Sequence, residues 1–263
     1  MVPAVRIDDV TVNVKEGRSI LDAAKMAGIW IPTLCHNPAL KSEGTCRLCV
    51  VEAVGEEGRS LVTACNYPIH QDIAVSVAGD RATRAREGVM KLLLARSPES
   101  EELKDLAKKM GVNGTPYPSV TESQRSCILC GLCVVVCEEA IGVSAIGFAG
   151  KSVNRTVAAP FRQPSEDCIA CGACAAVCPV GTIQVRIYEE TGEAEISPFK
   201  SRKKLLVCNE CGKNMVAEPV AAQMIDRVDF NWDEFRDLAR ICPDCRRKRA
   251  AKSLGYVDGL VSR

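Results

Sequence analysis

The sequence predicts an α+β protein made of several small units, and its sixteen cysteines mark out these units along 263 residues. Three observations support this prediction. The first 80 residues alternate short strands with one helix and carry four cysteines. Two cysteine runs of identical spacing follow a helical stretch, and two C-x2-C pairs stand further along. We expect the units to span residues 1–80, 81–120, 121–199 and 200–263.

The two cysteine runs lie between residues 127 and 178 and share the spacing C-x2-C-x2-C-x3-C. This is the spacing of a bacterial-type ferredoxin, in which three cysteines bind one [4Fe-4S] cluster and the fourth binds the other. Structural zinc is disfavoured, because it takes four ligands per site rather than interleaved sets of three plus one. Residues 121–199 are therefore predicted to be a 2[4Fe-4S] domain. One cluster is assigned to Cys127, Cys130, Cys133 and Cys178, and the second to Cys168, Cys171, Cys174 and Cys137.

Residues 1–80 carry the pattern of a β-grasp fold. Two short strands are predicted over residues 4–14, then a helix that starts at a Ser19–Asp22 capping box, a hairpin and a last strand over 73–77. This is the order of elements in a [2Fe-2S] ferredoxin, and its ligands would be Cys35, Cys46, Cys49 and Cys65. Their spacing, C-x10-C-x2-C-x15-C, differs from the plant-type C-x4-C-x2-C, so a zinc site stays open as the alternative.

The spacer, residues 81–120, is predicted to hold two helices and a linker. Asp80 is expected to cap the first helix, which Ser97 and Pro98 end. The second helix is expected over Glu101–Met110. The core-facing stripe of the first helix is predicted to be Ala85, Val89, Leu92 and Leu93.

Two C-x2-C knuckles separated by 30 residues predict a four-thiolate metal site in residues 200–263. Zinc is the preferred ion, because Gly212 permits a tight turn after the first knuckle and Pro243 stiffens the second. A further [4Fe-4S] cluster and mononuclear iron stay open, because the spacing alone does not separate them. The ligands would be Cys208, Cys211, Cys242 and Cys245.

Charge and motif content exclude several classes of protein. The net charge is +1, which argues against a nucleic-acid or membrane partner. The N-terminal residues do not resemble a signal peptide and no apolar run is long enough to span a bilayer, so we expect a cytoplasmic protein, in an anaerobe. No dinucleotide fingerprint or flavin loop is found, so neither NAD nor flavin is expected on this chain. Acidic and histidine side chains do not gather in a catalytic cluster, so no catalytic residue is predicted.

The order of motifs resembles the N-terminal iron–sulfur region of the large peripheral subunit of complex I. It is also similar to the diaphorase iron–sulfur subunit of bidirectional NiFe-hydrogenases and to the A subunit of electron-bifurcating hydrogenases. The resemblance covers about residues 1–190 and is carried by Cys35-His36, Cys46-Arg-Leu-Cys49, Ala64-Cys65, Arg81–Leu94 and Val143–Gly150.

The chain departs from these families in two respects that concern metal binding. The C-terminal pair of C-x2-C motifs lies outside the common pattern, and an Fe–S cluster there would supply a second exit for electrons. The other departure is a missing ligand set. Members usually carry a His-x3-C-x2-C-x5-C set after the first spacer helix, which holds a further [4Fe-4S] cluster. Here the corresponding stretch, residues 95–103, contains neither cysteine nor histidine. We therefore expect that cluster to be absent and electrons to take another route.

The resemblance implies a non-catalytic redox subunit of a multi-subunit oxidoreductase. Its partners would be a flavin subunit that oxidises or reduces NAD(P)(H) and a catalytic subunit of the hydrogenase or formate dehydrogenase type. Soluble ferredoxin is a further candidate partner, and electron bifurcation stays open. Two alternatives are a free polyferredoxin carrier and a regulatory iron–sulfur protein with a zinc ribbon. Near-neutral charge and several clusters in a row disfavour the regulatory alternative, because sensing needs only one cluster.

Overall fold

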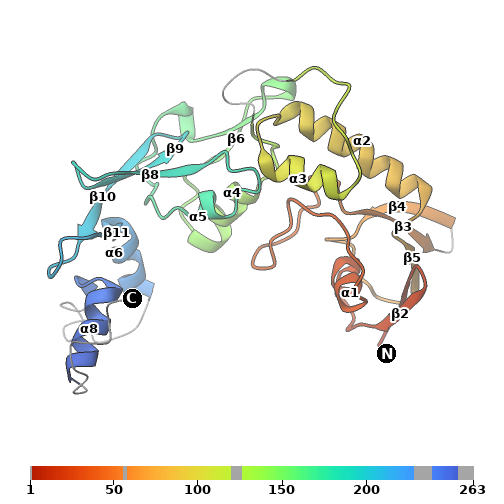
Figure 1. The fold of residues 1–263 in the computed structure, drawn as a ribbon, viewed down its shortest axis with the longest axis horizontal. Coiled ribbons are helices and arrows are strands. Elements are labelled where there is room, and N and C mark those ends of the chain that lie inside the picture. The colour runs from red at the N-terminus through yellow and green to blue at the C-terminus, as the bar shows by residue number, and fades with distance from the viewer. Residues whose placement is uncertain (1, 56–57, 120–125, 228–238, 254–263) are drawn as a thin grey trace.

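The computed structural model describes residues 2–55, 58–119, 126–227 and 239–253 (Figure 1). These residues form an arch, with the N-terminal sheet at one end, the spacer helices and the cysteine-rich domain along it, and the C-terminal module at the other end. Within these ranges, no helix combines the length and the apolar character that crossing a bilayer requires.

The N-terminal unit is a five-stranded sheet packed against one helix. The strand order is β2-β1-β5-β3-β4, with β1 and β5 parallel and all other neighbours antiparallel. The predicted β-grasp arrangement is confirmed. Its elements are β1 (Ala4–Ile7), β2 (Val10–Asn13), α1 (Ile20–Met26), β3 (Val50–Gly55), β4 (Gly58–Thr63) and β5 (Ile73–Ser76).

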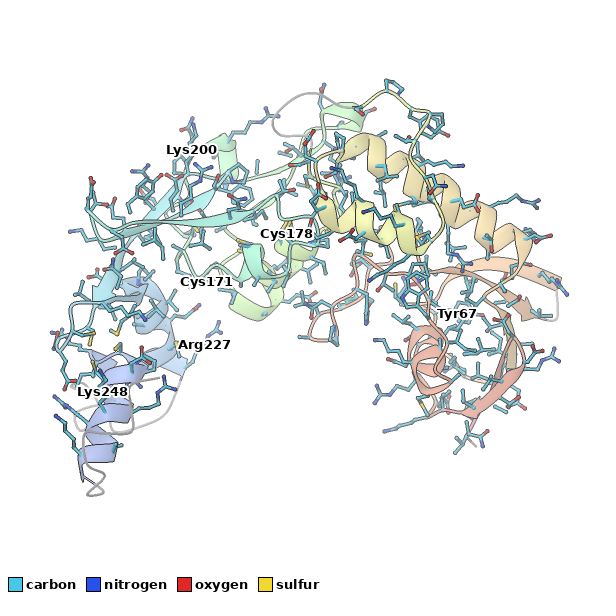
Figure 2. All side chains as sticks on the ribbon, viewed as in Figure 1. Tyr67, Cys171, Cys178, Lys200, Arg227 and Lys248 are labelled. Carbon is cyan, nitrogen blue, oxygen red and sulfur yellow. The ribbon has the colours of Figure 1, made fainter. Side chains whose placement is uncertain are left out.

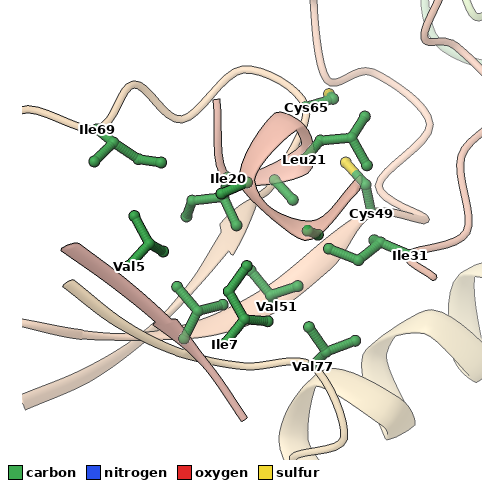
Figure 3. Packing of buried hydrophobic residues seen from close by; sticks show 14 of the residues in the cluster. Val5, Ile7, Ile20, Leu21, Ile31, Cys49, Val51, Cys65, Ile69 and Val77 are labelled. Atoms are coloured by element: carbon green, nitrogen blue, oxygen red, sulfur yellow. The ribbon is translucent and has the colours of Figure 1, made fainter. Parts of the chain in front are cut away.

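Local sequence explains how α1 starts and where it packs. The Ser19 side chain accepts a hydrogen bond from the backbone N–H of Asp22, and the Asp22 carboxylate accepts one from Ser19 in return, which forms the predicted capping box. The apolar face of α1 then lies on the sheet (Figure 3). The buried cluster between them includes Val5, Ile7, Ile20, Leu21, Val51 and Val75, and also the thiols of Cys49 and Cys65.

The spacer consists of α2 (Asp80–Arg96) and α3 (Glu101–Lys109), and its start differs from the prediction. Asp80 is the first residue of α2 rather than its cap. The N-cap is Gly79, and the capping acceptor comes from β3: Glu52 Oε1 accepts from the backbone N–H groups of Arg81 at 3.1 Å and Ala82 at 3.4 Å. A Cβ at Gly79 would stand 2.2 Å from this oxygen. Glu52, 29 residues before Arg81, therefore supplies the capping carboxylate that was expected from Asp80.

The buried face of α2 is also turned relative to the prediction. Leu93 is buried as predicted, but Leu92, also expected in the core, is 55% exposed, and Met90 and Leu94 are buried instead. The reason is a buried cation: Arg86 donates to the carbonyl oxygens of Val50 at 3.1 Å and Val77 at 2.7 Å. These two bonds attach α2 to the β-grasp sheet and set which side of the helix faces it.

The cysteine-rich domain combines short helical turns with a hairpin and a sheet. Its helical elements are α4 (Leu132–Val135), the π-helix η1 (Val136–Ile141), the 3₁₀ turns η2 (Ser152–Asn154) and η3 (Pro160–Arg162), and α5 (Ala173–Ala176). Its strands are β6 (Gly147–Ala149), β7 (Thr156–Ala158), β8 (Gln184–Tyr188) and β9 (Glu193–Ser197).

The C-terminal module continues the sheet of the cysteine-rich domain. β10 (Ser201–Val207) pairs antiparallel with β9, and β11 (Asn214–Ala217) pairs with β10, so the strand order is β11-β10-β9-β8. Helices α6 (Glu218–Arg227) and α8 (Pro243–Ser253) complete the described part of the module. One four-stranded sheet therefore contains strands from both sides of the boundary expected between residues 199 and 200.

We predict that Glu52→Ala frees the N-terminal turn of α2. The substitution leaves the N–H groups of Arg81 and Ala82 without their acceptor, which should cost about 1–3 kcal/mol of local stability. Amide exchange in the first turns of α2 should then accelerate about five- to hundredfold, measured by hydrogen exchange and mass spectrometry. The control is Asp9→Ala, which removes an exposed carboxylate. Unchanged exchange in α2 would contradict the capping role.

Candidate iron–sulfur and metal centres

The four N-terminal cysteines meet at the open end of the β-grasp core. Cys35 and Cys46 lie in the loop between α1 and β3, Cys49 directly precedes β3, and Cys65 follows β4; all four are buried. They approach as two pairs. The Cys46 thiol donates to Cys35 and holds the pKa of Cys35 down at about 5, and Cys65 acts in the same way on Cys49 and lowers its pKa to about 7. Two thiol pairs are what the two irons of a [2Fe-2S] cluster require.

The backbone of this loop curls around the thiols. Gly44 and Arg47 both have positive φ, at 64° and 59°, and a Cβ at Gly44 would stand 2.9 Å from the Asn66 amide nitrogen. This geometry points the N–H of Cys46 at the sulfur of Cys35, 3.3 Å away. N–H groups directed at sulfur stabilise a thiolate, which suits a loop that binds a cluster.

The first ferredoxin set is brought together around one cavity of about 850 Å³. Cys127, Cys130 and Cys133 from the first run line it together with Cys178 from the second run, and no other cysteine does. The pKa of Cys130 is raised to about 12, mainly by burial and to a lesser extent by the charges of Cys127 and Cys178. Four thiols around one cavity are the donor set of a [4Fe-4S] cluster, so these residues fit that group.

The members of the second ferredoxin set also lie close enough to influence one another across the two runs. Burial raises the pKa of Cys137, from the first run, and the charges of Cys168 and Cys171, from the second run, raise it further. The pKa of Cys174 is likewise raised to about 12, mainly by burial and then by the charges of Cys171, Cys168 and Cys137. Thiolates that raise one another's pKa in this way are stabilised when iron supplies the positive charge. Figure 2 shows Cys171 and Cys178 in the middle of the arch.

The two runs repeat the same backbone conformation as well as the same spacing. Gly131 and Gly172 have positive φ and precede α4 and α5. Leu129 and Ala170, at matching places in the two loops, also have positive φ, at 54° and 53°. Because an L-residue seldom adopts this conformation, its repetition indicates that each loop is shaped by what it encloses. The glycines could be found from the sequence, but nothing marks Leu129 and Ala170.

Contacts that the sequence did not reveal join the N-terminal set to the first ferredoxin set. Thr45 Oγ1, in the N-terminal loop, donates to the carbonyl oxygen of Cys130 at 2.8 Å. Cys35 and Cys46 share a buried cluster with Met90 and Leu93 of α2, and Cys130 and Cys178 pack against that cluster. The two sets therefore adjoin each other across the spacer.

The stretch that lacks cysteine and histidine, residues 95–103, holds the first ferredoxin loop in place. Arg96 Nε donates to the carbonyl oxygen of Cys127 at 2.8 Å, and the buried Ser97 hydroxyl donates to that of Ser126 at 2.6 Å. These contacts fix the start of the loop that carries Cys127. Neither contact could be predicted from the sequence, because the partners are about 30 residues apart.

The C-terminal cysteines converge on one point. Their four sulfur atoms all lie within 4.8 Å of one another, and the N–H of Cys242 donates to the sulfur of Cys208 at 3.2 Å. This N–H lowers the pKa of Cys208 to about 6. The group Cys208, Cys211, Cys242 and Cys245 has the geometry of a metal site, as the two knuckles predict.

Comparison with known protein families assigns the first two cysteine regions. Residues 4–79 match the 2Fe-2S iron–sulfur cluster binding domain, and residues 126–182 match the 4Fe-4S dicluster domain. The chain contains both iron–sulfur domains. The 2Fe-2S match decides between the iron–sulfur and zinc interpretations of residues 1–80, and the dicluster match confirms two [4Fe-4S] clusters in the ferredoxin domain.

Individual relatives agree with this assignment. The chain is 31% identical over 165 residues to "NADPH-Fe(3+) oxidoreductase subunit alpha" of Geobacter sulfurreducens, covering 54% of this chain and 19% of that protein. It is 26% identical over 268 residues to "NADH-ubiquinone oxidoreductase 75 kDa subunit" of Reclinomonas americana, covering 91% and 38%. The chain thus spans less than two fifths of the length of these two relatives.

A solved structure also resembles this one. A chain of NAD+-reducing [NiFe]-hydrogenase in the H2-reduced state superimposes with a TM-score of 0.59 and 27% identity, over 68% of this chain and 85% of that chain. The predicted resemblance to complex I and NiFe-hydrogenase subunits is therefore confirmed.

We predict that Cys178→Ser damages the cluster of the first run, not that of its own run. The motivation is the cavity that Cys178 shares with Cys127, Cys130 and Cys133. Iron should fall by about four atoms per chain. The electron spin resonance spectrum should match that of Cys127→Ser and differ from that of Cys168→Ser. A spectrum that matches Cys168→Ser instead would show that the ligands do not cross.

Proposed function

We propose that this chain is the electron-transfer subunit of a multi-subunit oxidoreductase that uses NAD(P)(H). The observation that carries the proposal is the continuity of its three iron–sulfur cysteine sets. The N-terminal set adjoins the first ferredoxin set through the Thr45–Cys130 hydrogen bond. The two ferredoxin sets share a second buried cluster, with Cys133 at its core and Cys137, Cys168, Cys174 and Cys178 packed around it. Cys178 packs against both buried clusters.

The proposed ligand sets are those given by the sequence and supported by the geometry above. When bound, the three clusters supply one-electron chemistry. The chain's own residues hold, bury and space them. The first set is Cys35, Cys46, Cys49 and Cys65; the second is Cys127, Cys130, Cys133 and Cys178; the third is Cys137, Cys168, Cys171 and Cys174.

The names of the relatives indicate one of the two redox partners, the nicotinamide cofactor. NADPH, NADH and NAD+ are each named in one of them, whereas the second substrate differs: ferric iron, ubiquinone or hydrogen. This chain carries no dinucleotide fingerprint, so the nicotinamide and its flavin belong on a partner subunit. The other partner would be a catalytic subunit of the hydrogenase or formate dehydrogenase type. We propose a reducing compartment such as the cytoplasm, because none of the sixteen cysteines forms a disulfide bond.

Anaerobic purification of the tagged chain from its own cells tests this proposal. The complex should contain a flavoprotein, and NADH or NADPH should reduce the clusters within it. The tagged chain alone should hold clusters that dithionite reduces and NAD(P)H does not. A single chain that elutes without partners would favour the free polyferredoxin, and co-purified nucleic acid would favour a regulatory protein. Reduction of the isolated chain by NAD(P)H would mean that it has its own dinucleotide site.

We predict about ten iron atoms per chain in the three proposed sites, two from one [2Fe-2S] and eight from two [4Fe-4S] clusters. Iron and acid-labile sulfide should be measured on anaerobically reconstituted protein. The electron spin resonance spectrum of the reduced protein should show three spin systems. Two irons or fewer per chain would contradict the ferredoxin assignment.

A further inference from the structure

The spacing of the C-terminal sulfur atoms is that of a single ion. All four lie within 4.8 Å of one another, and those of Cys211 and Cys242 are 3.7 Å apart. Thiolates at the corners of a tetrahedron, each about 2.3 Å from one zinc ion, stand about 3.8 Å from each other. In a [4Fe-4S] cube each thiolate binds a different iron, so the sulfur atoms have to stand further apart.

The rest of the chain provides an internal comparison. Among the residues that the structure describes, no other group of three or more cysteine, histidine or acidic side chains converges this closely. The twelve cysteines in the two iron–sulfur domains are arranged more openly, as ligands of multi-iron clusters should be. The C-terminal set differs from them in geometry.

The module also lacks a core of its own. Its buried cluster, within the described part, consists of Ile241 and three of the cysteines, with Met215 packed against it. The second knuckle sits in the first turn of α8, and the first fills the turn between β10 and β11. So little apolar burial does not hold the two knuckles and α8 together, whereas a structural metal does so in domains of this size.

We propose that Cys208, Cys211, Cys242 and Cys245 bind one structural zinc ion, and that the zinc-bound module clamps the helix that carries Cys137. The assignment of zinc does not depend on the proposed function. The role of the clamp rests on the proposed ligand set of the second ferredoxin cluster, to which Cys137 belongs. Zinc has no redox chemistry, so this centre takes no part in electron transfer.

The clamp is formed by the last turns of α6. This helix follows β11 directly, close to the first knuckle in the chain, and its Val220 packs against the buried cluster of the cysteine-rich domain. Arg227 donates to the carbonyl oxygen of Ile141 at 2.6 Å and to that of Ala140 at 3.4 Å, and Gln223 donates to Ile141 at 3.0 Å. Ile141 is the last residue of the π-helix η1, which contains Cys137. Figure 2 labels Arg227 on the side of the module that faces the cysteine-rich domain.

Arg227 is therefore a positioning residue. It satisfies carbonyl groups that the end of a helix leaves without partners, and it puts a positive charge at the negative end of the helix dipole. A positive charge near a cluster stabilises the reduced form, which carries one more electron. Losing this charge should lower the midpoint potential of the cluster bound by Cys137.

The first test is the metal content of the full-length chain purified without oxygen. We expect about one zinc in addition to about ten irons. Supplied Co²⁺ should take the place of zinc and give the visible absorption of tetrahedral thiolate coordination. About fourteen irons with matching sulfide would overturn the proposal in favour of a third [4Fe-4S] cluster. One extra iron without extra sulfide, or no metal at this site, would also overturn it.

Three variants keep this test independent of folding. Cys211→Ser should lose the zinc and keep all the cluster iron. Cys211→His should keep the zinc, because three thiolates and one imidazole also bind it, and the exposed Cys211 leaves room for the ring. Lys213→Ala, which changes a neighbouring exposed side chain, should keep both metals. Loss of four irons in Cys211→Ser would overturn the zinc assignment.

The second test addresses the clamp by redox titration followed by electron spin resonance. Arg227→Ala should lower the midpoint potential of the cluster whose signal is lost in Cys168→Ser, and leave that of the Cys127 set unchanged. Arg227→Lys should retain most of the wild-type potential. Because the β9–β10 pairing and Val220 also hold α6, Cys211→Ser should cause a smaller shift in the same direction, and Arg227→Ala should add the remainder in that background. An unchanged potential, or equal shifts in all clusters, would overturn the clamp without affecting the zinc result.

Discussion

The fold depends on the burial of sulfur. Each of the four buried apolar clusters in the described part of the chain contains cysteine side chains, and in the smallest of them cysteine is the main component. Burial raises the pKa of Cys127, Cys130, Cys133, Cys137 and Cys174, so these thiols do not ionise readily by themselves. Binding iron supplies the positive charge that makes a buried thiolate favourable, which links cluster binding to folding.

Helix geometry at the two loops supports the proposed crossing of ligands. In each run the third and fourth cysteines are four residues apart, as Cys133 and Cys137 are, and side chains with this spacing lie on the same face of a helix. In the first run, α4 and the π-helix η1 continue one another between these two cysteines. The two thiols can then serve neighbouring sites. With the proposed ligand sets, each cluster would join chain segments that are more than 30 residues apart and so stabilise the domain as a whole.

Much of this architecture could be predicted from the sequence, because cysteine spacing and helix caps are local signals. The β-grasp order, the Ser19 capping box and the two iron–sulfur domains all follow from patterns within short stretches. The residue at which α2 starts and the face that it buries could not be predicted in this way. Glu52 and Arg86 fix them through contacts with distant backbone groups, and periodicity within the helix carries no information about such partners. The contacts of Thr45, Arg96 and Arg227 were missed for the same reason.

The spacer and the C-terminal module each supply hydrogen-bond donors to the ferredoxin domain. A small cluster-binding domain has little apolar core, and the ends of its short helices and loops leave backbone carbonyls that need donors. On one side, Arg96 of α2 donates to the carbonyl of Cys127. On the other, Arg227 of α6 donates to Ile141, four residues after Cys137. An arginine from each neighbouring element thus supports one ferredoxin loop. Because β9 and β10 belong to one sheet, the second arginine is held in register with the domain it contacts. Zinc at the far end of that sheet would hold the two knuckles together without adding a redox centre.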